Sequence, residues 1–228
     1  MKMKYPEPFS ILRQASIRAS PYDRLRGCFA HARSYVESTS LEHVLAFALE
    51  HPENRESVAA LVSDALHVGF LFPQQELTPE CLSRAANEVG LCVGHATFPS
   101  AVVARELGLL ASLPQVPTTV FSSAVPPKND NGRRRYVEAF LPSAASDQVQ
   151  SWIDQEIATH VGLTLGSPAA LASVQEVFWG EGYKIPEFMG GESVVNPGKG
   201  VSVTYFEKKV GARSFRIEFM AFVPRREG

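Results

Sequence analysis

The stretch Ile157–Leu165, IATHVGLTL, carries the pattern on which the predicted fold depends. Its apolar side chains alternate with His160, Gly162 and Thr164, and this two-residue period is typical of a β-strand with one apolar face. The dipeptide Ser167-Pro168 follows and favours the start of a helix that runs to about residue 180. Because the apolar face can pack beneath that helix, we expect His160 on the opposite face of the sheet.

Two further strands are predicted towards the C-terminus. Val201–Lys209, VSVTYFEKK, and Ser214–Val223, SFRIEFMAFV, are rich in β-branched and aromatic residues. In the second of these strands, alternation places Arg216 and Glu218 together on the face opposite the apolar residues. If the strands that carry His160 and Glu218 line one concavity, both side chains face into it.

A similar succession of elements is predicted upstream, with His95 in its first strand and Glu138 in its last. The elements are a strand over Leu91–Phe98, a helix from Pro99 to Leu113, and strands over Pro117–Val125 and Arg134–Leu141. A polar helix over Ser146–Glu156 joins the two copies. The chain therefore contains two copies of a strand–helix–strands unit, beginning near residues 91 and 157, and the first copy is one strand short.

The first ninety residues are predicted to be helical. The predicted helices cover Tyr22–Glu37, Leu41–Glu50 and Glu56–Phe70, and a short helix follows Thr78-Pro79-Glu80. Ser40 and Thr78 are the expected N-caps. His31, His43, His51 and His67 lie in these segments without the spacing of metal ligands and are interpreted as structural. We therefore predict an α+β protein with a helical region over residues 1–90 and a second region over residues 91–228.

Composition excludes several classes of function. The 228 residues include 22 Lys and Arg against 24 Asp and Glu, and the net charge of −2 does not favour nucleic acid or an anionic membrane as a partner. Cys28, Cys81 and Cys92 match neither a zinc pattern nor a disulfide framework, so they are interpreted as reduced thiols of a cytoplasmic protein. The N-terminal residues lack the apolar stretch of a signal peptide, and no segment is long enough to span a membrane.

The sequence from His160 onwards resembles a module of the vicinal-oxygen-chelate superfamily. The resemblance rests on His160-Val-Gly-Leu-Thr-Leu, on a helix that ends in an aromatic–Gly–aromatic stretch, and on a final Arg-Ile-Glu-Phe. It covers roughly residues 91–223 and is strongest after residue 157. The superfamily includes glyoxalase I and the extradiol dioxygenases, and its members pair two βαβββ modules into a cupped mixed sheet around a divalent metal. The resemblance implies the same fold here.

The resemblance also implies a set of site residues. His95, His160 and Glu218 would bind the metal, and Glu138 would be either a fourth ligand or a catalytic carboxylate. Arg134 and Arg216 lie two residues from Glu138 and from Glu218, where one of them could clamp a substrate carboxylate. For each arginine and for Glu138, a solvated surface residue is the alternative.

Three functions follow from these assignments. Two histidines and one carboxylate suit Fe(II) in a non-haem dioxygenase that binds O₂ and a small 2-oxo or hydroxy carboxylate. With Glu138 in the metal site, a glyoxalase-type isomerase or lyase using Zn²⁺, Ni²⁺ or Mn²⁺ is the second hypothesis. A metal-free module that binds a small molecule is the third.

The nearest subfamily resembled is that of 2-oxoadipate dioxygenase/decarboxylase. A helical N-terminal region precedes the first predicted ligand, and Trp152-Ile-Asp leads through a short helix to His160. This chain is shorter than expected for that subfamily, and Pro99 stands where an arginine would be expected. The modules can pair within one chain or across a homodimer.

Overall fold

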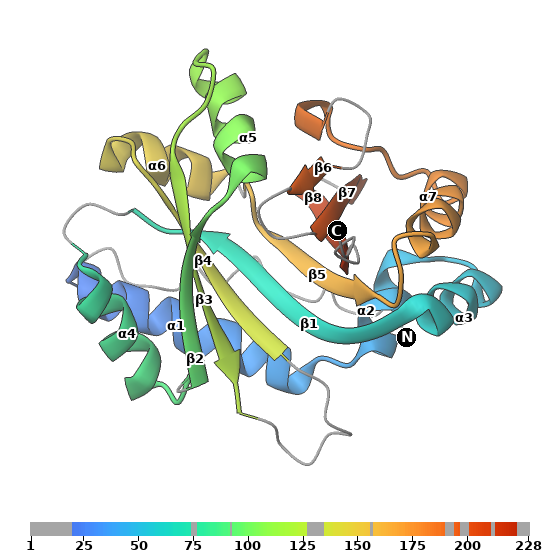
Figure 1. Cartoon of the computed structure of the whole chain (residues 1–228), viewed down its shortest axis with the longest axis horizontal. Coiled ribbons are helices and arrows are strands. Elements are labelled where there is room, and N and C mark those ends of the chain that lie inside the picture. The colour runs from blue at the N-terminus through green and yellow to red at the C-terminus, as the bar shows by residue number, and fades with distance from the viewer. Residues whose placement is uncertain are drawn as a thin grey trace, which may run out of the picture. The chain divides into compact units, whose positions relative to one another are not determined.

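The structure is a computed structural model in which residues 20–73, 77–91, 93–126, 135–155, 157–189, 194–196, 201–210 and 213–222 are described (Figure 1). Over these residues the fold is α+β, with a mixed sheet of eight strands in the order β2-β3-β4-β1-β5-β8-β7-β6. The predicted fold class is confirmed.

The described residues divide into two compact units. The first unit comprises residues 39–66 and 160–222, and the second comprises residues 20–38 and 67–159. The division falls inside strand β1, which spans Val62–Leu71, so the first half of this strand belongs to one unit and the second half to the other. This division does not test a domain boundary at residue 90, which stays a prediction.

The first unit contains helices on either side of β1 in the sequence and the C-terminal strands. Its elements are α2 (Leu41–Ala48), α3 (Pro52–Leu61), β5 (His160–Leu165), α7 (Ala170–Gly180), the 3₁₀ helix η1 (Glu187–Met189), β6 (Val194–Asn196), β7 (Val201–Val210) and β8 (Arg213–Phe222). Within it, β5 runs parallel to β8, and β7 is antiparallel to both β8 and β6.

The second unit contains the longest helix and the remaining strands. Its elements are α1 (Pro21–Ser38), α4 (Pro79–Glu88), β2 (Val93–Pro99), α5 (Ala101–Ala111), β3 (Thr118–Val125), β4 (Arg135–Pro142) and α6 (Ser146–Asp154). The strands β2, β3 and β4 form an antiparallel meander, and α1 packs against α4 and β4.

The strand order reveals two βαβββ repeats. The first is β1-α4-β2-β3-β4, with α5 added between β2 and β3, and the second is β5-α7-β6-β7-β8. In each repeat the opening strand lies beside the closing strand, giving the orders β1-β4-β3-β2 and β5-β8-β7-β6. The predicted duplication is confirmed, but the first copy begins at Val62 rather than near residue 91, and β1 is the strand that was missing from it.

The predicted helix over Glu56–Phe70 is wrong in its second half. Helix α3 ends at Leu61, and the chain continues directly as β1. The apolar run Val58–Phe72 contains residues at both three- to four-residue and two-residue spacings, and a run of this kind does not distinguish a helix from a buried strand. The expected N-caps are confirmed, since the side chains of Ser40 and Thr78 accept hydrogen bonds from the first turns of α2 and α4.

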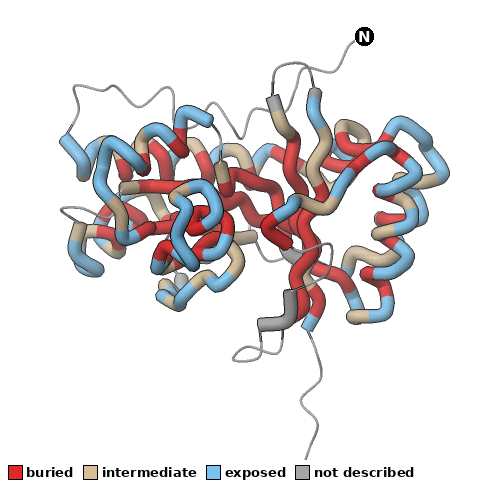
Figure 2. Tube along the Cα trace, turned by 90° about the horizontal axis from the view of Figure 1, so that it is seen from above, coloured by how far each residue is buried: buried red, intermediate tan, exposed pale blue. Residues whose placement is uncertain are grey.

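Buried residues are concentrated in the strands, and the outer sides of the helices are exposed (Figure 2). In the second unit, Phe29 of α1 packs against Phe70 and Phe121 on one face of the sheet. On the other face, α5 and α6 cover a separate apolar cluster. This cluster comprises Leu71, Val103, Leu107, Val116, Val120, Phe140, Val149, Trp152, Ile153 and Ala158.

Glu181 at the end of α7 caps the beginning of α3. The side chain of the α3 N-cap residue, His51, makes no capping hydrogen bond. Glu181 instead accepts hydrogen bonds from the backbone N–H groups of Glu50 and His51, at 2.9 and 3.2 Å, and from the Asn54 amide at 2.7 Å. Burial alone would raise the pKa of Glu181, but these hydrogen bonds to the ionised form outweigh it and lower the pKa below its ordinary value.

We expect Glu181→Gln to destabilise the protein by about 1–2 kcal/mol at pH 7, because a charged acceptor is lost from a helix N-terminus. A lowered folded-state pKa contributes stability that is present above the unfolded pKa of about 4.3 and is lost as the pH falls through the folded value. Urea unfolding at pH 7 and pH 3 tests this: the difference from the unsubstituted protein should shrink at pH 3. Glu176→Gln, on the exposed side of α7, is the matched control and should change little.

Candidate metal site

The β5–β8–β7 part of the sheet separates an apolar face from a polar one. On the apolar face, the ring centroid of Phe178 in α7 lies 5.1 Å from that of Phe219 and 5.0 Å from that of Phe206. Val161 of β5 pairs with Ile217 of β8, and both are fully buried. The predicted packing of the apolar face of β5 beneath the following helix is therefore confirmed.

The opposite face of these strands holds His160, Glu218 and Tyr205. Gly162 pairs with Glu218, so His160, two residues earlier, lies on the same face as Glu218. His160 Nε2 lies 3.4 Å from Glu218 Oε2, and the two side chains are 0% and 7% exposed. Tyr205 pairs with Glu218 across β7 and β8, and its ring stands perpendicular to the His160 ring at 5.2 Å. An imidazole and a carboxylate are thus held together away from water.

His67 is a buried residue of β1 with 1% of its surface exposed. Alternation places it on the same face of β1 as Gly69 and Leu71, and Leu71 belongs to the cluster beneath α5 and α6. Phe70 points the other way, towards Phe29 of α1. His67 therefore does not lie in a helix, as the sequence analysis had predicted, but is an inward-facing residue of the opening strand of its module.

His67, His160 and Glu218 form a buried group that could hold a metal ion. One ligand atom from each residue lies within 4.8 Å of the others. Nitrogen and oxygen ligands bound to one ion at about 2.1 Å lie no more than about 4.2 Å apart. Imidazole and carboxylate ligands suit Zn²⁺, Fe²⁺, Ni²⁺ and Mn²⁺. The donor set therefore fits a divalent transition metal.

His95 is not part of this group. Its ring nitrogens lie 3.0 Å from Ser123 Oγ and 3.0 Å from Asn87 Oδ1. The ring also packs at 5.2 Å from Phe121, which lies on the α1 side of the sheet, whereas His67 faces the α5 and α6 side. The prediction that His95 joins His160 and Glu218 is not reproduced, because His95 belongs to the second strand of its module and points to the opposite face.

A sequence signal for His67 was present. The tripeptide His-Val-Gly occurs twice, at residues 67–69 and 160–162. In the structure each copy lies in the opening strand of a module, with the histidine and the glycine on one face. Matching the two modules by this tripeptide would have selected His67, whereas matching them by the helix that follows selected His95.

Glu138 lies on the same face of its sheet as His67. It pairs with Ser122, and the next residues on that face, Val120 and Phe140, belong to the same cluster as Leu71. Glu138 is half-buried and is not among the three grouped residues. The structure thus brings a second carboxylate to the face of β4 that corresponds to the Glu218 face of β8.

The two predicted arginines have different outcomes. Arg134 lies outside the described residues. Arg216 shares the face of Glu218, but its Nη2 and Nε donate to one carboxylate oxygen of Glu207, at 2.8 and 3.2 Å. Its guanidinium also lies 5.2 Å from the centre of the Phe188 ring. Arg216 is therefore held by its own neighbours, and a role in binding substrate stays a prediction.

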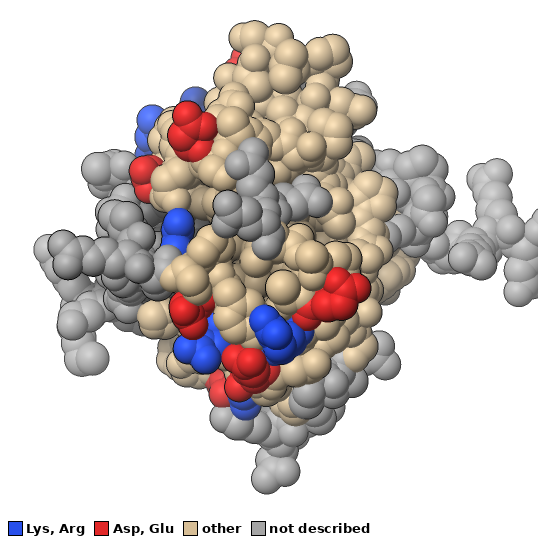
Figure 3. Space-filling model, turned by 90° about the vertical axis from the view of Figure 1, so that its left-hand side faces the viewer, with Lys and Arg blue, Asp and Glu red and all other residues tan. Residues whose placement is uncertain are grey.

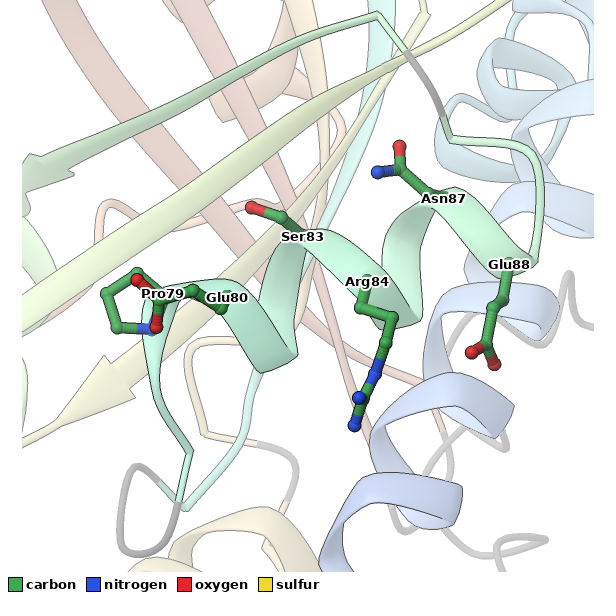
Figure 4. A pocket seen from close by; sticks show the side chains of 6 residues that line it. All are labelled: Pro79, Glu80, Ser83, Arg84, Asn87 and Glu88. Carbon is green, nitrogen blue, oxygen red and sulfur yellow. The ribbon is translucent and has the colours of Figure 1, made fainter.

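A shallow groove of about 480 Å³ lies on the exposed side of α4, and none of the three grouped residues lines it (Figure 4). It is lined by Pro79, Glu80, Ser83, Arg84, Asn87 and Glu88. Among the described residues on the face shown in Figure 3, acidic and basic side chains lie next to each other and form no large patch of one sign. In the described parts of the chain, no helix has the length and apolar character needed to cross a membrane.

We expect His67→Asn and His160→Asn each to lower the affinity for Co²⁺ at least 100-fold, because each removes one of three ligands. His95→Asn is the matched control and should leave the affinity unchanged, since that ring faces away from the group. Titration of the chelator-treated protein with Co²⁺, followed by absorption, measures all three. Loss of affinity in His95→Asn with normal affinity in His67→Asn would contradict the assignment of His67.

No family model and no curated protein matches the sequence. Among solved structures, the chain is similar to a variant of Streptomyces coelicolor methylmalonyl-CoA epimerase in complex with 2-nitronate-propionyl-CoA. The identity is 11% and the TM-score 0.41, over 72% of this chain and 99% of that chain. A selenomethionine methylmalonyl-CoA epimerase gives 12% and 0.42, over 72% and 98%. At this level of similarity, neither structure indicates an activity for this chain.

Proposed function

We propose that the protein is a metal-dependent isomerase or lyase that binds a small substrate through two of its oxygen atoms. The observation that carries the proposal is the buried group of His67, His160 and Glu218. Three protein ligands leave coordination positions for substrate, which is the arrangement of catalytic rather than structural metal sites. The metal would be one of the divalent ions that suit imidazole and carboxylate ligands.

A divalent ion in this site would supply Lewis-acid polarisation of the substrate oxygens. The protein supplies the ligands and a surrounding that excludes water, since all three ligand residues are buried. Tyr205 packs against the His160 ring and so limits its rotation. A ring fixed in this way keeps its Nε2 directed towards Glu218, which favours one coordination geometry.

Glu138 is the residue that we propose as the proton carrier. It lies on the same face as His67 but outside the ligand group, so its carboxylate remains available for proton transfer. Its oxygen would accept a proton from a carbon atom next to the substrate carbonyl and deliver it to the neighbouring atom on the same side of the substrate, which regenerates the carboxylate. No net oxidation is needed, and O₂ is not a substrate in this reaction.

A non-haem Fe(II) dioxygenase is the second candidate. It is favoured by the type of ligands, because two histidines and one carboxylate are the set used by non-haem Fe(II) oxygenases. In that case the substrate would be a 2-oxo or hydroxy carboxylate, and Glu138 would not be required for metal binding or for proton transfer. The two candidates therefore differ in their need for O₂ and for Glu138.

We expect Glu138→Gln to abolish metal-dependent exchange of a substrate C–H proton with solvent while leaving Co²⁺ affinity within about threefold, because only the proton carrier is lost. The assay follows loss of C–H signals by NMR in D₂O under argon, for a panel of 2-oxo and 2-hydroxy carboxylates. Glu53→Gln, an exposed carboxylate of α3, is the control.

Exchange that survives Glu138→Gln would contradict the role of Glu138. Turnover that requires O₂ and persists in Glu138→Gln would favour the dioxygenase. A protein that binds no divalent metal would leave the metal-free binding module as the remaining hypothesis.

A further inference from the structure

The turn that leads from α6 into β5 contains a residue with a left-handed backbone. Ala158 has a φ of 57°, a conformation that the β-carbon of an L-residue disfavours by roughly tenfold. Its side chain is 1% exposed and belongs to the apolar cluster that also contains Trp152 and Ile153 of α6. The backbone N–H of the preceding residue, Ile157, donates to the carbonyl of Trp152 at 3.0 Å. Packing and this hydrogen bond therefore hold an unfavourable backbone conformation in place.

The end of a helix does not explain this conformation. Among the described residues other than glycine, only Ser112 also has a positive φ, of 56°. Ser112 is the C-cap of α5, where a left-handed residue commonly ends a helix, and its N–H donates to two carbonyl groups of that helix. Helix α6 instead ends at Asp154, and its C-cap residue has a φ of −89°. The strain at Ala158 thus lies beyond the cap of α6, two residues before His160.

His160 depends on the turn before it because it is the first residue of β5. The register of β5 with β8 begins one residue later, at Val161. His67, by contrast, lies within β1 and has strand residues on both sides. Two extended residues span about 7 Å, so an unopposed rotation of about 10° at Ala158 would move the backbone of His160 by about 1 Å. A functional constellation must be held within about 0.5 Å, so the conformation of Ala158 matters for the placement of this ligand.

We infer that Ala158 is a positioning residue for the metal site, because its left-handed backbone and packed methyl group fix the start of β5 and with it His160. The inference rests on the proposed metal site and concerns the residue that orients one of its ligands. Backbone strain that no helix end requires is expected to persist where it serves a functional group. Glycine would adopt the same conformation without strain, but it would adopt others as readily, so the ligand would be less well ordered.

Ala158→Gly tests the inference through metal affinity and stability together. Titration of the metal-free, full-length protein with Co²⁺, followed by absorption, should give an affinity at least about fivefold lower than that of the unsubstituted protein. The absorption bands of bound Co²⁺ should also change, since they report the arrangement of the ligands. In urea unfolding of the metal-free protein, the folding equilibrium constant should stay within about tenfold, because relief of strain offsets the loss of a buried methyl group.

Two matched variants separate position from stability. Ser112→Gly relieves the same backbone strain at the end of α5, so stability should not fall and Co²⁺ affinity should stay within about twofold. Thr159→Val changes the residue next to Ala158, whose buried hydroxyl has no hydrogen-bond partner among the described residues. Loss of that hydroxyl should raise the folding equilibrium constant, while Co²⁺ affinity stays within about twofold because valine has the shape of threonine.

The possible failures are distinguishable. If the unsubstituted protein binds no Co²⁺, the metal site and this inference are overturned together. If it binds Co²⁺ and Ala158→Gly has the same affinity and absorption bands, only the inference is overturned. A folding equilibrium constant lowered by more than about tenfold in Ala158→Gly would assign Ala158 to stability rather than to position. An equal loss of affinity in Ser112→Gly or Thr159→Val would also overturn the inference, because the effect would not depend on the backbone of Ala158.

Discussion

The contact between His160 and Glu218 is the constraint on which the arrangement of the strands in the first unit depends. A carboxylate on a side chain that is only 7% exposed loses most of its hydration, and the cost is several kcal/mol unless partners replace the water. The strand register brings His160 to this carboxylate: Gly162 and Tyr205 flank Glu218, His160 lies two residues from Gly162, and its Nε2 is 3.4 Å from Glu218 Oε2. The opposite faces of the same strands carry the aromatic core with α7. A one-residue slip of β5 or β8 would therefore place the polar pair in the core, which makes the register strongly specified.

Much of this architecture could be predicted from the sequence because the patterns were unambiguous. The N-caps Ser40 and Thr78 mark their helices, and the strongly alternating Ser214–Val223 could only be a strand. The error lay in β1, where a largely apolar run, interrupted by Ser63, Asp64 and His67, follows a true helix with no glycine or proline between them. Such a run satisfies both periods, and only its pairing in the sheet decides between them. Because this segment was predicted as a helix, His67 was not predicted as a site residue.

Only part of the candidate site could be predicted from the sequence, because a local pattern does not show how a strand is placed in the sheet. His160 and Glu218 were found because alternation alone shows that they face away from the apolar side of their strands. His95 satisfied the same local criteria, yet its imidazole is satisfied by Ser123 and Asn87 on the other face of its sheet. Local sequence gives the parity of a side chain within its own strand, but not which face of the sheet that parity corresponds to, since this depends on the helices that pack there. Only the α1 and α5 layers of the second unit decide that question.

The duplicated strand order has an evolutionary consequence. Each module contributes an opening-strand histidine, at His67 and at His160, but only the second also contributes its closing-strand carboxylate to the group, at Glu218. Neither repeat alone supplies all three residues of the group, so the group depends on both repeats. The counterpart of Glu218 in the first repeat, Glu138, is not among the three grouped residues, so the group does not depend on it. Divergence at this one position is then the simplest route by which such a chain could acquire a new reaction without changing the three grouped residues.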